Sequence, residues 1–233
     1  MNVQWYGQST FHLTAPEASV TIDPFADMSE LAASRGMQFD YPPIQGVEAT
    51  LLLVTHEHID HNGVEAIGGD PTILRSTAGR LESPVGEVIA IASEHDEEAG
   101  TARGPNTIFV FELDGLRVSH FGDFGQSSLR DEQAAAIGDL DLLFIPVGGG
   151  PTIGADQAAQ IIARLRPRWS CPCTTARRAS GSSRPRTPSS GAPSTSNTCP
   201  SPPSTRPAYR PPTVRWWSSQ RCRKGIPPTA PRS

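Results

Sequence analysis

The stretch Thr55-His56-Glu57-His58-Ile59-Asp60-His61 contains four potential metal ligands, all within residues 56–61. It directly follows residues 50–54, an apolar run whose length and aliphatic composition are typical of a buried β-strand. The ligands therefore fall in the loop where that strand ends. Imidazole suits zinc and similar metals, a carboxylate adds negative charge, and ligands this close together can face one cation. The pattern predicts a metal-dependent enzyme.

This HxHxDH pattern resembles the signature of the metallo-β-lactamase-fold hydrolases. Further matches follow in that family's order: Trp5-Tyr6-Gly7, Asp23-Pro24, Glu94-His95-Asp96, Gly104-Pro105-Asn106-Thr107, His120-Phe121-Gly122-Asp123 and Pro146-Val147-Gly148-Gly149. The set is most similar to the branch that includes the L-ascorbate-6-phosphate lactonase-like proteins, and it covers residues 1–168. The resemblance implies an α/β fold, an αββα sandwich that holds one or two metal ions at its edge.

The resemblance also implies a role for each matching ligand. The first metal site would consist of His56, His58 and His95, and most of the second site of Asp60, His61 and the bridging Asp123. Asp60 is in addition the residue that we assign to catalysis. We expect one or two Zn²⁺ ions, with Mn²⁺ or Fe²⁺ as alternatives, because ligand type alone does not fix the metal.

Some of these residues have a plainer interpretation when they are considered singly. His95 lies among acidic residues, as a solvated surface histidine would, and Asp123 follows a glycine, as a turn residue often does. The resemblance favours a ligand role for both. His120 precedes Asp123 by three residues in a strand-like segment and would face away from it, so we expect it to pack behind the site. His12 is expected to be structural.

A site of this kind predicts hydrolysis by metal-bound hydroxide, because divalent cations lower the pKa of bound water and polarise a carbonyl or phosphoryl oxygen. No serine or cysteine nucleophile is then required. Residues 1–168 contain no cysteine, and we find neither a GxSxG elbow nor a phosphate-binding P-loop. We expect a small polar substrate, such as a lactone or a phosphoester, and Arg103 and Asn106 are candidates for orienting it.

A nuclease of the same fold, acting on RNA or DNA, is an alternative function. Such an enzyme needs a basic groove for the phosphate backbone. Residues 1–168 hold 9 of the 20 Lys and Arg and all 24 Asp and Glu, a net charge of −15, and they include no lysine. This acidic balance favours a small-molecule substrate over nucleic acid.

The composition changes abruptly near Trp169. Residues 169–233 hold the other 11 basic residues, all four cysteines and no acidic residue, a net charge of +11. The segment is rich in Ser, Pro and Arg, shows no lasting period of 2 or 3.6 residues, and offers few apolar residues for a core. We therefore divide the chain into an incomplete metallo-hydrolase domain, residues 1–168, and a disordered tail, residues 169–233.

A shift of reading frame explains this tail. The resembling family would continue after Arg168 into an apolar strand that ends in Pro-Met-His-Tyr, whose histidine completes the second metal site. With suitable synonymous codons, one G restored after the Arg168 codon gives Arg-Val-Val-Val-Pro-Met-His-Tyr-Arg-Thr, which is that strand and ligand. The same shift turns Arg215-Trp216-Trp217-Ser218 into a run containing Val-Val-Val. The second hypothesis for this chain is therefore a catalytically impaired or inactive product that still binds metal.

Two other interpretations of the tail are weaker. A basic arm for nucleic acid would neutralise phosphates, but the arginines form no regular stripe and few aromatic residues lie between them. Cys171 and Cys173, with Cys199 and Cys222, could bind zinc or form disulfides, but the spacing is weak and we find no secretory signal. Cysteines that arise by chance in an altered frame are a simpler account.

The remaining elements are ordinary for one domain. We predict strands within residues 3–6, 10–13, 20–22, 88–92, 108–111, 116–120 and 142–145. A helix is predicted over residues 156–165, with Asp156 as its N-cap. Residues 27–48 are expected to form a long loop near the site that acts as a substrate lid. No apolar run approaches the length of a membrane span, so we expect a soluble cytoplasmic protein of unknown oligomeric state.

Overall fold

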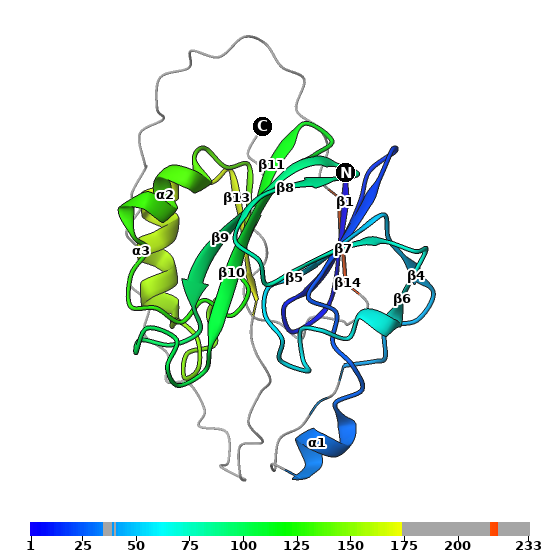
Figure 1. The fold of residues 1–233 in the computed structure, drawn as a ribbon, viewed down its shortest axis with the longest axis horizontal. Coiled ribbons are helices and arrows are strands. Elements are labelled where there is room, and N and C mark those ends of the chain that lie inside the picture. The colour runs from blue at the N-terminus through cyan, green and yellow to red at the C-terminus, as the bar shows by residue number, and fades with distance from the viewer. Residues whose placement is uncertain (35–38, 40, 174–214, 219–233) are drawn as a thin grey trace, which may run out of the picture.

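The chain folds into two β-sheets packed face to face (Figure 1). The computed structural model describes residues 1–34, 39, 41–173 and 215–218. The first sheet has the strand order β14 (Arg215–Ser218), β1 (Asn2–Gly7), β2 (Thr10–Thr14), β3 (Ser19–Ile22), β5 (Leu51–Val54) and β7 (Thr72–Arg75). The second has the order β13 (Trp169–Cys173), β12 (Leu142–Pro146), β11 (Leu116–His120), β10 (Pro105–Leu113), β9 (Gly86–Glu94) and β8 (Gly79–Ser83). These sheets confirm the predicted metallo-β-lactamase-type sandwich.

The helices lie outside this pair of sheets. Helices α2 (Asp131–Ile137) and α3 (Ala155–Leu165) cover the outer face of the second sheet, whereas α1 (Ser29–Ser34) lies beyond one end of the first (Figure 1). A short 3₁₀ helix η1 (Val64–Ala66) and a small parallel sheet of β4 (Val47–Glu48) and β6 (Ile67–Gly68) complete the described elements.

The core follows from the alternation of side chains along each strand. On β10, Phe109 and Phe111 face the space between the sheets, while Ile108 and Val110 face the helices. Between the sheets, the rings of Phe11 and Phe144 lie 4.1 Å apart, centroid to centroid. Aromatic and aliphatic side chains from both sheets therefore fill one continuous apolar layer.

Strand β5, the run that precedes the metal motif, is buried on both faces. Leu51 and Leu53 pack between the sheets, whereas Leu52 faces a separate cluster on the outer side with Phe25 and Ile44. A parallel strand between two parallel neighbours, β3 and β7, explains why all four of its residues are apolar.

Two predictions about local structure need correction. Helix α3 begins at Ala155 after the N-cap residue Gly154, whose amide is capped by the Gln157 side chain, so Asp156 lies in the first turn and is not the N-cap. The expected loop of residues 27–48 contains α1, because Asp27 accepts the Ser29 amide at 2.9 Å and starts a helical turn.

The strand directions bring several loops to one edge of the sandwich. Strands β3 and β5 are parallel, so the segments that follow both lie at the same edge of the first sheet. Strands β9 and β11 both pair antiparallel with β10, so their carboxyl ends also share one edge. The amide of Thr107 donates to the Thr55 carbonyl oxygen at 2.9 Å and ties these two edges together.

Two short pieces of the segment predicted to be a disordered tail form strands instead. Residues 169–173 form β13, which pairs in parallel with β12, and residues 215–218 form β14, which pairs in parallel with β1. In β13 the side chains of Trp169, Cys171 and Cys173 pack on the core between the sheets, while Ser170 and Pro172 are exposed. This alternation of packed and exposed side chains is what an edge strand requires, and it is present although the surrounding sequence is basic. The rest of the predicted tail, residues 174–214 and 219–233, lies outside the described residues.

The added strand makes a specific prediction for hydrogen exchange. The Trp169 amide donates to the Asp141 carbonyl oxygen at 2.8 Å, so it should exchange with solvent much more slowly than an amide in an unstructured peptide. Exchange measured by NMR or mass spectrometry checks this. Exchange of the Trp169 amide at the rate of an unstructured peptide would mean that β13 does not form and that the tail begins at residue 169 after all.

Candidate metal centre

Histidine and aspartate side chains converge at the shared edge in two overlapping groups. One consists of His56, His58 and His95, and the other of His56, His61 and Asp123. Within each group the potential ligand atoms all lie within 4.8 Å of one another. All of these residues are buried except His58, which is half-buried. The first group is the same trio that the sequence predicts for the first metal site.

Two histidines of the HxHxDH motif, His56 and His61, are held through their Nδ1 atoms. His56 Nδ1 lies 3.0 Å from Thr55 Oγ1, and His61 Nδ1 lies 2.9 Å from Asp23 Oδ2. The Nε2 atoms of both rings are buried and have no hydrogen-bond partner. A buried polar atom without a partner is costly, so these atoms favour a ligand between them. Nδ1 hydrogen bonds that orient Nε2 are typical of histidines that bind metal.

His95 and Asp123 approach from the second sheet. His95 Nδ1 lies 3.1 Å from the Pro151 carbonyl oxygen, which leaves Nε2 facing Asp123 Oδ2 at 3.2 Å. Asp123 Oδ2 also lies 3.4 Å from His61 Nε2, and Asp123 Oδ1 is buried without a partner. Asp123 therefore lies between the two groups, where one carboxylate can contact a cation in each.

Asp60 is more peripheral than the sequence predicts. Its Oδ2 lies 3.8 Å from His61 Nε2, and its side chain is 24% exposed. It belongs to neither of the compact groups among the described residues. Its carboxylate therefore lies between solvent and the second group.

The electrostatics of the centre favour the neutral forms of His56 and His58. Burial lowers the pKa of His56 strongly, and burial together with the nearby His95 lowers the pKa of His58. Histidine binds a metal in its neutral form, so these rings are ready to act as ligands at neutral pH.

His61 and Asp123 behave as a buried ion pair. Burial opposes the charged form of both, but the carboxylates of Asp123 and Asp23 outweigh it and raise the pKa of His61 well above its usual value. Burial alone would raise the pKa of Asp123, but His61, His95 and His56 together outweigh it and hold this pKa well below its usual range. A cation between them would replace the proton on His61, since a histidine ligand must be neutral.

The two remaining histidines, His120 and His12, are not ligands in this arrangement but have structural contacts. His120 accepts the Gly122 amide at Nδ1 and lies 3.0 Å from the Ser9 carbonyl oxygen through Nε2, so it packs behind the site as predicted. His12 lies 2.9 Å from Thr21 Oγ1 on the first sheet, away from the ligand groups, in keeping with a structural role.

Neither of the two candidates for orienting substrate, Asn106 and Arg103, is directed toward the ligand groups by its described contacts. Asn106 is buried, its amide nitrogen donates to Ser93 Oγ and to the Phe121 carbonyl oxygen, and its Oδ1 accepts the Asp123 amide at 3.0 Å. Its side chain therefore fixes the Asp123 loop and is not available to substrate. Arg103 is exposed in the turn that Asp96 organises, and no described contact points it to the ligands.

The sequence analysis missed Asp23 as a functional residue, although its Asp-Pro pair was part of the resemblance. Its carboxylate accepts the Thr55 amide at 2.8 Å and the Thr55 hydroxyl at 2.7 Å, in addition to contacting His61. The available signal was an aspartate directly after a predicted buried strand that runs parallel to the metal-motif strand. Gly122 was also missed: a Cβ there would lie 2.5 Å from Thr55 Oγ1, and its φ of +56° favours glycine.

The described cysteines do not join the ligands. No compact group of metal-binding side chains among the described residues contains Cys171 or Cys173. Burial raises the pKa of the Cys173 thiol well above its usual value, and its Sγ lies 3.8 Å from Ser9 Oγ. A buried protonated thiol is a poor ligand.

The role of Asp23 can be tested by mutation. We expect Asp23→Asn to weaken metal binding about 10- to 100-fold, because the amide cannot hold His61 and Thr55 as the carboxylate does. Metal titration measures the affinity directly. The control is Asp70→Asn, an exposed residue with a φ of +54° that asparagine also tolerates. Equal affinity in Asp23→Asn and the parent would remove Asp23 from the metal centre.

Comparisons with known proteins agree with this geometry. The model of the beta-lactamase superfamily domain matches residues 2–174, which ends at the carboxyl end of β13. A UPF0173 protein of Pyrococcus abyssi is 28% identical over 195 residues, which cover 74% of this chain and 82% of that protein. A UPF0173 metal-dependent hydrolase of Thermococcus kodakarensis is 27% identical over 199 residues, covering 72% and 81% of the two chains.

A solved structure is similar as well. The crystal structure of a Thermotoga maritima protein, assigned to the zinc-dependent hydrolases of the metallo-β-lactamase superfamily, matches with a TM-score of 0.58 and 26% identity. The match covers 73% of this chain and 74% of that one. In the described residues, no helix is long and apolar enough to cross a membrane. With its fold, its family match and its clustered histidines, this chain belongs to the metallo-β-lactamase superfamily of metal-dependent hydrolases.

Proposed function

We propose that this protein hydrolyses a small polar substrate, a lactone, a phosphoester or a similar bond, at a centre of one or two divalent cations. Zn²⁺ is the first choice of metal, with Mn²⁺ or Fe²⁺ as alternatives. The ligands would be His56, His58 and His95 for the first ion, and Asp60, His61 and Asp123 for the second. The observation that carries this proposal is the convergence of buried Nε2 and Oδ1 atoms that have no hydrogen-bond partner.

The chain's own residues would share the work of hydrolysis. A bound divalent cation supplies the Lewis acidity that makes water nucleophilic near neutral pH and stabilises negative charge on the substrate oxygen. Asp123, with its Oδ2 within 3.4 Å of His61 Nε2 and 3.2 Å of His95 Nε2, is suited to bridge two ions. Asp60 is the most exposed carboxylate beside the centre and would accept the proton of the attacking water.

The assignment of the ascorbate-6-phosphate lactonase-like branch, and of a lactone or phosphoester in particular, rests on the motif resemblance. A phosphodiesterase acting on RNA or DNA remains the alternative for the same centre. It is disfavoured by charge, because Asp and Glu outnumber Lys and Arg by 24 to 9 in residues 1–168.

We also propose that the chain after Arg168 is encoded out of frame and that this impairs the second metal site. Strand β13 supports this proposal, because it ends at Cys173 beside Ser9. The pKa of the Cys173 thiol is raised by burial and then by Cys171, and the carboxylates of Asp123 and Asp23 add to this, so the strand ends within electrostatic reach of the second ligand group. In the restored frame, the expected histidine directly follows position 173, as a late second-site ligand would require.

Metal dependence is the first test of the proposed function. We expect His58→Ala to lose most of the bound metal and at least about 100-fold in hydrolysis, because a three-ligand site has no ligand to spare. The matched control is His12→Ala, which removes a histidine from β2 and should keep the metal content of the parent. Elemental analysis and a chelation experiment measure both effects. Full metal content in His58→Ala, or hydrolysis that survives complete chelation, would contradict the proposal.

Frame repair is the second test. Restoring one base after the Arg168 codon should raise the metal stoichiometry and increase hydrolysis, because the second group would gain a ligand. The given chain and the repaired chain would be compared on panels of lactones and phosphodiesters, and sequencing the source DNA across this codon gives an independent check. Equal metal stoichiometry and equal turnover in the two proteins would contradict the frame-shift proposal, and the proposal of a metal centre would still stand.

A further inference from the structure

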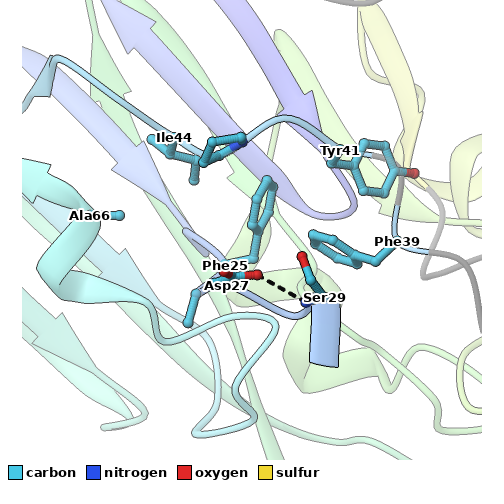
Figure 2. Close-up of a pocket in the computed structure, with 9 residues that line it drawn as sticks. Phe25, Asp27, Ser29, Phe39, Tyr41, Ile44 and Ala66 are labelled. Carbon is cyan, nitrogen blue, oxygen red and sulfur yellow. Dashed lines mark hydrogen bonds between the residues drawn. The ribbon is translucent and has the colours of Figure 1, made fainter. Parts of the chain in front are cut away.

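We propose that a pocket beside the metal centre holds an uncharged apolar group of the substrate, an alkyl or aryl substituent. This inference rests on the proposed function, since it describes the part of the substrate that is not hydrolysed. The pocket has a volume of about 360 Å³. It is lined by Phe25, Ala26, Asp27, Ser29, Phe39, Tyr41, Pro43, Ile44 and Ala66 (Figure 2). Its volume lies at the lower end of the range for small-molecule sites.

An aromatic wall gives the pocket its chemical character. The ring of Phe39 meets the rings of Phe25 and Tyr41 edge to face, with centroid distances of 5.0 and 5.3 Å (Figure 2). Rings this close contact one another and leave no room for a ligand between them. They therefore form one continuous apolar surface, and a ligand group would pack against it. Tyr41 is itself held in place on Gly7, where a Cβ would lie 2.2 Å from its ring.

The charge around the pocket narrows the kind of ligand. Asp27 is the only carboxylate among the lining residues; it is exposed, and its Oδ1 accepts the Ser29 amide (Figure 2). Its hydrogen bonds with Ser29 lower the pKa of Asp27, so it is charged at neutral pH. An anionic group would be repelled by this carboxylate, and an apolar wall offers a charged group no partner. A neutral alkyl or aryl group fits both features.

The pocket and the metal centre are built from the same two loops. Asp23, which holds His61, is followed two residues later by Phe25 of the aromatic wall. The Ala26 amide, in the pocket lining, donates to the Ile59 carbonyl oxygen at 3.2 Å in the metal motif. These contacts place the pocket directly beside the ligand loop.

Close packing fixes this arrangement. The Gly63 amide donates to the Pro24 carbonyl oxygen at 2.7 Å, and a Cβ on Gly63 would lie 2.4 Å from the Ala26 nitrogen. Between His58 and Asp60, the side chain of Ile59 is 44% exposed, which is unusual for a large apolar residue in the described part of the chain. Ile59 is also the residue whose carbonyl oxygen accepts the Ala26 amide of the pocket lining, so this exposed apolar side chain belongs to the point where the metal motif and the pocket lining meet.

The test fills the pocket without touching the metal ligands. Ala66→Leu adds a side chain into the lining, and Phe39→Ala removes part of the aromatic wall. The control is Ala136→Leu, which adds the same atoms at an exposed position on α2. The probe is 4-fluorobenzyl alcohol, a neutral aromatic compound, whose binding is followed by ¹⁹F NMR. We expect saturable binding to the parent and the control, and about tenfold weaker binding to both pocket variants. No binding to the parent, or equal binding to all four proteins, would overturn the inference.

A pair of lactones separates this inference from the proposed function. The ratio of kcat/KM for γ-phenyl-γ-butyrolactone to that for γ-butyrolactone should exceed one in the parent and fall about tenfold in Ala66→Leu. If both lactones are hydrolysed with a ratio that Ala66→Leu leaves unchanged, the pocket inference fails and the proposed function stands. If neither lactone is hydrolysed but the probe binds and Ala66→Leu weakens it, the proposed lactone hydrolysis fails and the pocket stands.

Discussion

The metal centre depends on one buried carboxylate, that of Asp23. It accepts the amide and the hydroxyl of Thr55 and contacts Nδ1 of His61, so a single side chain fixes both the start and the end of the metal motif. A carboxylate with no exposed surface must be satisfied in this way, because an unpaired buried charge is strongly destabilising. Thr55 in turn lies against His56 Nδ1. The geometry of two ligands therefore follows from the position of one residue, directly after the neighbouring strand β3.

The sequence predicts what is local and misses what depends on contacts between distant segments. The first-site trio and most strands follow from the HxHxDH motif, from short apolar runs and from the family resemblance. Asp23 is invisible as a partner of His61 because 38 residues separate them and only the parallel pairing of β3 and β5 brings them together. The role of Asn106 was missed for the same reason: 17 residues separate it from Asp123, and the pairing of β10 with β11 brings them together.

At residues 169–173, amino-acid composition predicted disorder, whereas the alternation of inward and outward side chains matches the strand that forms there. Residues 169–173 lie in a basic, serine- and proline-rich segment, yet every second side chain packs on the core between the sheets. Five residues are too few for a period to stand out, and two of the three inward-facing positions are filled by cysteines, which the sequence analysis attributed to chance in an altered frame. The pocket wall was also missed, since Phe39 and Tyr41 lie in a segment expected to be a loop and acquire their role only by packing on Phe25 and Gly7.

The central claim is that the unpartnered atoms of this edge bind metal, and anomalous X-ray diffraction from zinc-loaded crystals tests it most directly. The account predicts a strong peak at the zinc absorption edge among the Nε2 atoms of His56 and His95 and the His58 ring. A weaker second peak is predicted beside His61 and Asp123, because only these two ligands of the second group remain once His56 binds the first ion. Zinc at other places only, with both groups empty at saturating metal, would contradict the account.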